Sequence, residues 1–200
     1  MVKMVNRCSW ANYNDAMKVY HDKEWCNPVH DDQVLFEFLV LEGAQAGLSW
    51  NTILQKRENF RKAFDKFDYK KIAKYNERKI EELLNDSSII RNKLKIASVI
   101  TNANALLKVQ EEIGSFDKYI WNFVNDTPIN NEFKTLEELP SKTQLSELIS
   151  KNLKKRGFKF VGPTIVYSFM QAVGMTNDHT ADCFRYEEIN QINNKKANIK

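Results

Sequence analysis

The sequence predicts an all-α fold, built as a single globular domain of about seven to nine helices. Hydrophobic residues recur at helical spacing along most of the 200 residues. There are only 6 glycines and 4 prolines, whereas an all-β sandwich or barrel needs many more turn residues. We find no β-rich stretch, no internal repeat and no linker between two cores. A chain of this length buries roughly 70% of its unfolded surface, so it can fold without disulfides.

The first half of the chain carries a series of helical patterns. Asp31 and Asp32 can cap the first of them, whose apolar positions run from Val34 to Leu41. A stretch that contains Gly43 and Gly47 comes next, and further helical patterns follow it. They predict one helix over 50–67, two short helices over 69–75 and 77–85, and a long helix over 88–112.

In the second half, Ser115 is placed to cap a helix over 116–124, and residues 126–140 read as mostly loop. The Asn- and Lys-rich end is typical of a frayed tail. We therefore expect the domain to span 1–186 and a flexible tail to span 187–200.

A helix–hairpin–helix pattern occupies about residues 143–174. A segment of capping-box form at 141–144 opens the first helix, which reaches about Arg156, and Pro163 opens the second. Glycines in the connector allow close approach to a ligand, and the free N–H groups at the second helix suit a phosphate. The residues that would contact DNA are Gly157, Gly162, Lys154, Lys155, Arg156 and Lys159. The alternative is an ordinary helical hairpin with a solvated basic face.

Composition narrows the class of protein. The chain is 42% hydrophobic and 28% charged, and it carries a net charge of +4, which permits a nucleic-acid partner without showing one. No apolar run approaches the roughly 18 residues that span a membrane. The first residues lack the apolar segment of a signal peptide, so we expect a cytoplasmic protein. We also expect a monomer without a nucleotide cofactor.

The three cysteines and three histidines gather at the two ends of the chain, as zinc ligands often gather in sets. Two sets of four are conceivable from spacing. His179 and Cys183 are four residues apart and share one face if the segment is helical. Buried free cysteines with unrelated histidines are the alternative. The local set is Cys8, His21, Cys26 and His30, and the set that joins the ends is Cys8, His21, His179 and Cys183.

Two long and unusual stretches are LEGAQAGLSW at 41–50 and LKKRGFKFVG at 153–162. With several shorter stretches, they resemble the 3-methyladenine DNA glycosylase I family. Together the matching stretches run in order over residues 8–183. The others are Cys8-Ser9-Trp10, Tyr20-His21-Asp22, Glu24-Trp25, Ile89-Ile90-Arg91, a segment over 116–125, Tyr167–Ala172 and Asn177-Asp178-His179.

The resemblance implies a helix-hairpin-helix enzyme that removes 3-methyladenine from alkylated double-stranded DNA. It also selects the zinc set that joins the ends, with one structural Zn²⁺ per chain. Two positions depart from the family pattern. Cys26 stands where the family usually has glycine, so it is an alternative ligand, and Asp182 stands where a small or neutral residue is expected.

The chemistry of this reaction suits the matching residues. The enzyme must flip the base out of the stack, and a methyl group on N3 makes adenine a cation that leaves easily. Aromatic rings hold such a cation by stacking and cation–π attraction. The resemblance points to Tyr20 and Trp50, with Trp10 and Trp25 as second choices. The alternative is that these rings pack the core.

Glu42 is the candidate catalytic residue, because a carboxylate complements the cation and accepts hydrogen bonds from its exocyclic amine. Leu48 is a candidate wedge that fills the space left by the flipped base. Thr164 stands where related enzymes carry a nucleophilic lysine, which favours hydrolysis without strand cleavage. Asp178 or Asp182 is placed to stabilise a sugar cation, and Asp178 alternatively orients His179.

Two other functions remain open from the sequence. One is a zinc-containing DNA-binding module that keeps the hairpin without catalysis. The other is a glycosylase whose specificity has drifted, for example towards 3-methylguanine.

Overall fold

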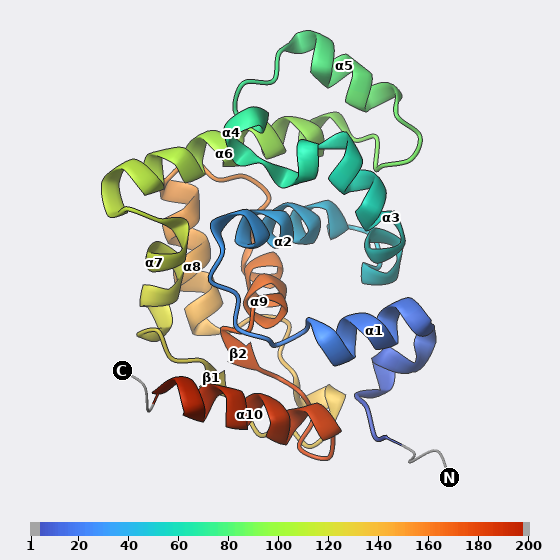
Figure 1. Ribbon diagram of the computed structural model, residues 1–200, viewed down its shortest axis with the longest axis vertical. Helices are drawn as coiled ribbons and strands as arrows, with labels where there is room; N and C mark the ends of the chain where they lie inside the picture. The colour runs from blue at the N-terminus through green and yellow to red at the C-terminus, as the bar shows by residue number, and fades with distance from the viewer. Residues whose placement is uncertain (1–4, 198–200) are drawn as a thin grey trace.

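Helix α2 (Asp32–Gln45) lies at the centre of the molecule in the computed structural model, which describes residues 5–197 (Figure 1). Its residues from Leu35 to Ala44 are all buried, because the helix is apolar around most of its circumference and other helices pack on several sides. Asp31 caps it by accepting hydrogen bonds from the backbone N–H groups of Gln33 and Val34. The helix thereby holds Glu42 inside the protein.

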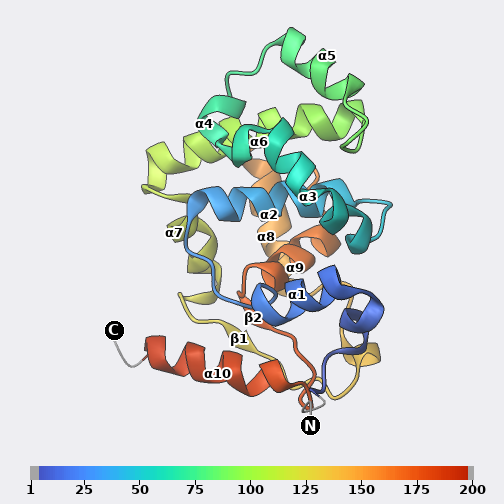
Figure 2. The same ribbon diagram turned by 45° about the vertical axis from the view of Figure 1, so that its right-hand side comes forward.

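The other elements surround α2 (Figures 1 and 2). The α-helices are α1 (Asp15–Lys23), α3 (Trp50–Ala63), α4 (Tyr69–Ile72), α5 (Glu77–Asn85), α6 (Lys93–Ile113), α7 (Phe116–Trp121), α8 (Gln144–Lys155), α9 (Pro163–Ala172) and α10 (Phe184–Ala197). Short 3-10 helices cover Ser9–Tyr13, Asp65–Phe67, Asn122–Val124 and Leu136–Glu138. The all-α single domain is confirmed, and no helix in residues 5–197 is long and apolar enough to cross a membrane.

Two helices were not expected from the sequence. Helix α1 is capped by Asn14, whose side chain accepts from the N–H of Met17. Helix α10 occupies most of the segment expected to be a frayed tail, so that prediction is wrong as far as residue 197; residues 198–200 lie outside the described part. Ile189 is fully buried, and Asn177 donates to Asn190 and to the carbonyl of Tyr186, which explains why the helix docks.

Several helix boundaries also differ from the predictions, and three of them have a clear local cause. The helix expected over 50–67 ends at Ala63, because residues 65–67 adopt positive φ angles. The long helix begins at Lys93 rather than 88, where Asn92 supplies the cap. The capping box of α8 is formed by Thr143 and Ser146 and not by the segment that begins at Ser141.

The segment 126–140 is mostly loop, as predicted, with one two-residue strand and the 3-10 helix Leu136–Glu138. Strand β1 (Ile129–Asn130) pairs in parallel with β2 (Thr176–Asn177). The N- and C-terminal segments also meet, since the N–H of Phe184 donates to the carbonyl of Asn6 at 3.0 Å. Both ends of the described chain therefore lie at the same end of the molecule (Figures 1 and 2).

Helices α8 and α9 form the expected hairpin, and its connector packs against α2. Asn102 holds the connector by accepting from the N–H of Lys159 at 2.7 Å and donating to its carbonyl at 3.0 Å. Gly157 ends α8 with a φ of +91°, a conformation that favours glycine. A Cβ on Gly43 would lie 3.2 Å from the Cβ of Phe160, so the connector approaches α2 beside Glu42.

Candidate active site and metal centre

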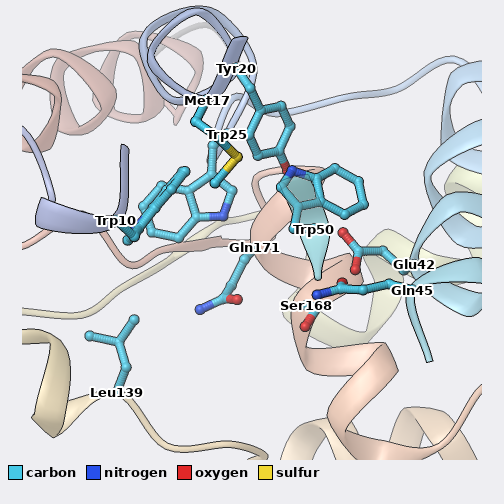
Figure 3. Close-up of a pocket in the computed structure, with 10 residues that line it drawn as sticks. All are labelled: Trp10, Met17, Tyr20, Trp25, Glu42, Gln45, Trp50, Leu139, Ser168 and Gln171. Atoms are coloured by element: carbon cyan, nitrogen blue, oxygen red, sulfur yellow. The ribbon is translucent and has the colours of Figure 1, made fainter. Parts of the chain in front are cut away.

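A cavity of about 300 Å³ opens where α1, α2, α3 and α9 meet (Figure 3). Its walls are largely aromatic, with one acidic residue and several uncharged polar groups. The lining residues are Trp10, Met17, Tyr20, Trp25, Glu42, Gln45, Trp50, Leu139, Ser168 and Gln171. The structure thus brings together Glu42 and all four aromatic residues singled out in the sequence.

The four rings form two pairs. Tyr20 and Trp50 lie with ring centroids 5.1 Å apart at an interplanar angle of 49°, and Trp10 meets Trp25 edge-on at 5.0 Å. Tyr20 is buried, and its burial raises the pKa of the phenol well above the usual value, with the nearby Glu42 as a further cause. Tyr20 therefore presents a neutral, electron-rich ring to the cavity.

Glu42 is the acidic residue of the cavity and the source of any negative charge in its wall. It is only 3% exposed, and its Oε2 has no hydrogen-bond partner in the described part of the chain. Burial raises the pKa of its carboxyl to about 8. The Nε1 of Trp50, on the same cavity, is also buried without a partner. Unpaired buried polar groups are costly, so the pair indicates a ligand that supplies a hydrogen-bond donor and an acceptor.

Five lining residues were not singled out from the sequence. Gln45, Ser168 and Gln171 lie within the stretches that carry the family resemblance, which was the available signal. Met17 and Leu139 offer no such signal. Leu139 comes from the loop before α8, and only the folded chain places it at the cavity.

A second hollow of about 200 Å³ adjoins the first and shares Glu42, Gln45 and Ser168 with it. It lies between the loop after α2 and the first turn of α9. Leu48, in that loop, is 41% exposed although it is apolar, which suits a wedge. Thr164 lines the hollow, and no lysine lines either cavity.

The hairpin presents three of its four predicted cations to solvent. Lys154, Lys155 and Lys159 are exposed and form no ion pair within residues 5–197. Arg156 instead bonds Glu112 at 2.7 Å, and its guanidinium lies 4.8 Å from the centre of the Tyr119 ring. The guanidinium of Arg156 therefore joins the hairpin to the rest of the domain in this structure, and its expected DNA contact stays a prediction.

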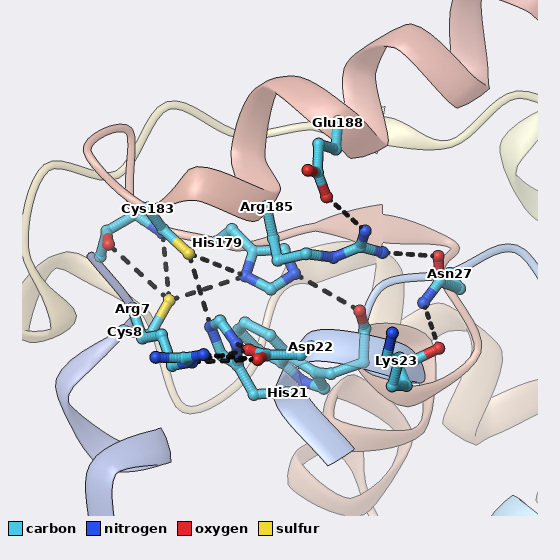
Figure 4. Close-up of polar contacts among 12 residues, drawn as sticks. Arg7, Cys8, His21, Asp22, Lys23, Asn27, His179, Cys183, Arg185 and Glu188 are labelled. Atoms are coloured by element: carbon cyan, nitrogen blue, oxygen red, sulfur yellow. Dashed lines mark hydrogen bonds and ion pairs between the residues drawn. The ribbon is translucent and has the colours of Figure 1, made fainter. Parts of the chain in front are cut away.

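The predicted ligand set that joins the ends forms a buried cluster (Figure 4). The ligand atoms of Cys8, His21, His179 and Cys183 all lie within 4.8 Å of one another. The Sγ of Cys183 is 3.5 Å from both His21 Nε2 and His179 Nδ1. The segment from His179 to Cys183 is not helical; a turn closed by the Cys183 N–H on the Thr180 carbonyl brings the two ligands together.

In each histidine, the ring nitrogen that faces away from the cluster contacts another group, and this contact orients the ring. The Nδ1 of His21 bonds Asp22 at 2.8 Å, and Arg7 holds Asp22 in turn. The Nε2 of His179 points at the Trp25 carbonyl at 3.4 Å. Burial lowers the pKa of His179, which favours the neutral imidazole that binds metals. The cluster thus has four soft or borderline donors suited to a transition metal.

The local ligand set is wrong. His30 is exposed, and its Nδ1 lies 2.8 Å from Asp117 Oδ1, away from the cluster. Cys26 is fully buried, and its Sγ accepts a hydrogen bond from the N–H of Asp178. Neither residue belongs to the cluster of ligand atoms.

The two aspartates considered from the sequence do not line either cavity. Asp178 is fully buried and bonds Tyr167, Gln171, Thr176 and Asn131 instead of orienting His179. Asp182 is exposed and accepts from Asn6 at 2.8 Å. The structure therefore gives neither carboxylate a position for stabilising a sugar cation.

Comparison with known proteins decides the family. The model of the methyladenine glycosylase family matches residues 10–186. The chain belongs to the methyladenine glycosylase family. It is 47% identical over 182 residues to DNA-3-methyladenine glycosylase 1 of Escherichia coli (strain K12), covering 91% of this chain and 97% of that protein.

Solved structures agree with this membership. A crystal structure of 3-methyladenine DNA glycosylase I superposes with a TM-score of 0.87 at 46% identity, covering 90% of this chain and 98% of that one. A variant of such a glycosylase in complex with 3-methyladenine also gives a TM-score of 0.87, at 34% identity, covering 90% of this chain and 96% of that chain.

In this methyladenine glycosylase, the Cys/His cluster and the aromatic cavity share a wall. The ring of Trp25 meets His179 edge-on at 4.7 Å, and Trp10 meets His21 at 5.2 Å. Both tryptophans also line the cavity. A metal that fixes the two imidazoles therefore also fixes one side of the cavity.

Proposed function

We propose that this protein is a DNA-3-methyladenine glycosylase that flips and excises 3-methyladenine from alkylated double-stranded DNA. It hydrolyses the N-glycosidic bond and leaves an abasic site. The observation that carries this proposal is the buried Glu42 carboxyl, whose Oε2 has no hydrogen-bond partner among residues 5–197, in an aromatic cavity of about 300 Å³. The relatives named above support it, because their names give this activity and one structure holds 3-methyladenine.

The cavity suits a cationic base better than a neutral one. The methyl group on N3 puts a positive charge on the base, and the base leaves as a neutral molecule, so no strong general acid is needed. Tyr20 and Trp50 hold the ring by stacking and cation–π attraction, with Trp10 and Trp25 beside them. The carboxyl of Glu42 has a pKa of about 8 in the empty cavity. When the cationic base enters, the carboxyl releases its proton to solvent, and the carboxylate then binds the base.

The DNA lies across the hairpin and the loop after α2. Lys154, Lys155 and Lys159 contact phosphates without reading sequence, and Gly157 and Gly162 allow the backbone to approach closely. Leu48 enters the space that the flipped base leaves. This arrangement puts the base at the adjoining hollow that leads to Glu42.

Thr164 supports hydrolysis of the glycosidic bond without strand cleavage. It stands where related enzymes carry a nucleophilic lysine, and no lysine lines either cavity. Water is then the nucleophile, and no covalent bond joins the protein to the sugar. Borohydride should trap no protein–DNA adduct during turnover. Efficient trapping at neutral pH contradicts this part of the proposal.

The metal is one structural Zn²⁺ per chain, held by Cys8, His21, His179 and Cys183. The donor set fits, since two thiols and two oriented imidazoles are buried within 4.8 Å of one another. When bound, a zinc ion with four protein ligands supplies structural stability and has no open position for water. We further propose a cytoplasmic monomer that uses no nucleotide cofactor.

The test is an incubation of the purified protein with methylated duplex DNA, with released bases identified by chromatography. We expect release of 3-methyladenine and an abasic site in intact strands. A protein that binds duplex DNA but releases no base is the non-catalytic binding module instead.

A further inference from the structure

Gln171 is on α9 and lines the cavity, and Asp178 holds its side-chain amide by a hydrogen bond. Its Nε2 donates to Oδ2 of Asp178 at 2.7 Å. Its Oε1 accepts no hydrogen bond in the described part of the chain. Figure 3 shows the amide of Gln171 at the centre of the group of lining residues, facing the space that Glu42 and Trp50 border.

Asp178 permits only one orientation of that amide. Its Oδ2 accepts hydrogen bonds from Tyr167 at 2.5 Å and from Gln171 at 2.7 Å. Its Oδ1 accepts hydrogen bonds from Thr176 at 2.6 Å and from Asn131 at 2.7 Å. A carboxylate oxygen accepts hydrogen bonds, so a flipped amide would place two acceptors against each other. The NH₂ group of Gln171 therefore stays on Asp178, and the carbonyl oxygen is the atom presented to the cavity.

Two of the acceptors that line the cavity therefore come from different helices and have a fixed character. One is the carboxyl of Glu42 on α2, and the other is Oε1 of Gln171 on α9. At position 6, an adenine carries an amine with two hydrogens to donate, whereas a guanine carries an oxygen that can only accept. Two acceptors match the amine and repel the oxygen.

We propose that Gln171, oriented by Asp178, is a specificity-determining residue that accepts a hydrogen bond from the base and selects 3-methyladenine over 3-methylguanine. Gln171 would touch the base, whereas Asp178 acts through Gln171 as a positioning residue. This inference rests on the proposed function and deepens it, because it names the feature of the base that the second acceptor reads.

The variant Gln171→Met tests the proposal, because it keeps the length of the side chain and removes the acceptor. Its kcat/KM is compared with that of the parent protein on the same duplex carrying either 3-methyladenine or 3-methylguanine. A hydrogen bond to a charged partner corresponds to roughly a tenfold or larger effect. We expect 3-methyladenine excision to fall about tenfold while 3-methylguanine excision stays equal or rises. An equal loss for both bases, or no loss, overturns the proposal.

Tyr167→Phe is the matched control. It removes one donor from the same Oδ2 of Asp178 but leaves the amide of Gln171 in place. We expect the ratio of the two excision rates to stay within twofold of the parent. A ratio that changes as much as in Gln171→Met means that packing around Asp178 sets the preference, which also overturns the proposal.

Binding of the free bases separates this inference from the proposed function. Quenching of tryptophan fluorescence by free 3-methyladenine and 3-methylguanine reads the preference without catalysis, since Trp50 borders the cavity. A parent protein that releases no base contradicts the proposed function alone. A parent that binds both free bases equally contradicts the role of Gln171.

Discussion

Lys95 donates a hydrogen bond from its Nζ to the carbonyl oxygen of Ala46 at 2.7 Å. The same ammonium group also bonds the carbonyl of Ala44 at 2.8 Å. The first turn of α6 thus satisfies the carbonyls at the end of α2 and holds the loop that carries Leu48. Burial lowers the pKa of Lys95. This contact joins the long helix α6 to the loop at which we propose that the base leaves the duplex.

Replacing Lys95 with Met should loosen that loop. The two carbonyls lose a charged donor, so we expect the free energy of unfolding to fall by about 1–3 kcal/mol. Excision from duplex DNA should slow several-fold, whereas binding of free 3-methyladenine should change less than twofold because the cavity walls remain. Lys93→Met is the control, since Lys93 is exposed and unpaired in the described chain. Equal effects of both variants contradict the role given to Lys95.

Glu42→Gln should slow excision of 3-methyladenine without abolishing it. A buried, charge-assisted hydrogen bond contributes about 1.5–3 kcal/mol, so a ten- to hundredfold loss of kcat/KM is expected. Tyr20 and Trp50 still hold the cation, and affinity for undamaged duplex should barely change. Single-turnover assays measure the rate. If the variant excises 3-methyladenine at the rate of the parent, Glu42 has no role in excision. If the variant is folded but inactive, Glu42 has a direct chemical role.

The pKa of about 8 for Glu42 also predicts how stability depends on pH. The folded chain holds this proton more tightly than the unfolded chain, whose carboxyl has a pKa near 4.5. The contribution of Glu42 to stability is therefore present below pH 4.5 and is lost as the pH rises to about 8. Glu42→Gln should be more stable than the parent by up to about 3–5 kcal/mol at pH 9, and by much less at pH 5. Urea unfolding at both pH values measures the difference; a gap that is independent of pH disagrees with this pKa.

The same group predicts a pH profile for the reaction. The carboxyl must be ionised to bind the cationic base, so kcat/KM of the parent should rise with pH up to about pH 8 and level off only above about pH 9. The profile of Glu42→Gln should lack this rise. A profile that is unchanged by the substitution assigns the titration to another group.

Elemental analysis of protein purified without added metal should find about one zinc per chain. Cys8→Ser and Cys183→Ser should lose the metal and unfold at lower temperature, because both remove a ligand. Cys26→Ser is the matched control, since Cys26 is equally buried but lies outside the cluster. Loss of zinc from Cys26→Ser with retention in Cys183→Ser would reverse the ligand assignment.

Replacing Lys154, Lys155 and Lys159 with Ala should weaken binding to all duplexes alike. Each phosphate contact contributes about one unit to the slope of log affinity against log salt concentration, so the slope should flatten by up to about three. Replacing Lys70, Lys71 and Lys74, on and beside α4, changes the net charge equally and should alter the slope less. Loss of affinity for only one sequence context contradicts the role of the hairpin.

Much of the fold and of the site was predictable because it depends on local order in the sequence. Helical periodicity, Ser115 and Pro163 placed several helices, and the motif-bearing stretches marked Glu42 and the four aromatic rings. The ends of helices were predicted less well. Asn92 caps the long helix five residues later than periodicity suggested, since apolar residues before it pack in an irregular segment.

Contacts between distant segments were beyond the reach of the sequence. Arg156 belongs to a basic run, yet Glu112 on another helix binds it. Asp178 was a candidate for orienting a metal ligand, but the fold surrounds it with four hydrogen-bond donors, and these turn the carbonyl of Gln171 towards the cavity.

The sequence alone determined the helical class, the stretches that carry the chemistry and the two conceivable ligand sets. Spacing left both sets open, and the family resemblance favoured the one that joins the ends. The tertiary structure shows that set gathered, because His30 and His179 differ in what surrounds them and not in residue type. It also decided the state of Glu42, whose pKa of about 8 comes from burial. The free energy of a charge or a hydrogen bond depends on the solvent and partners around it, and the folded chain sets both.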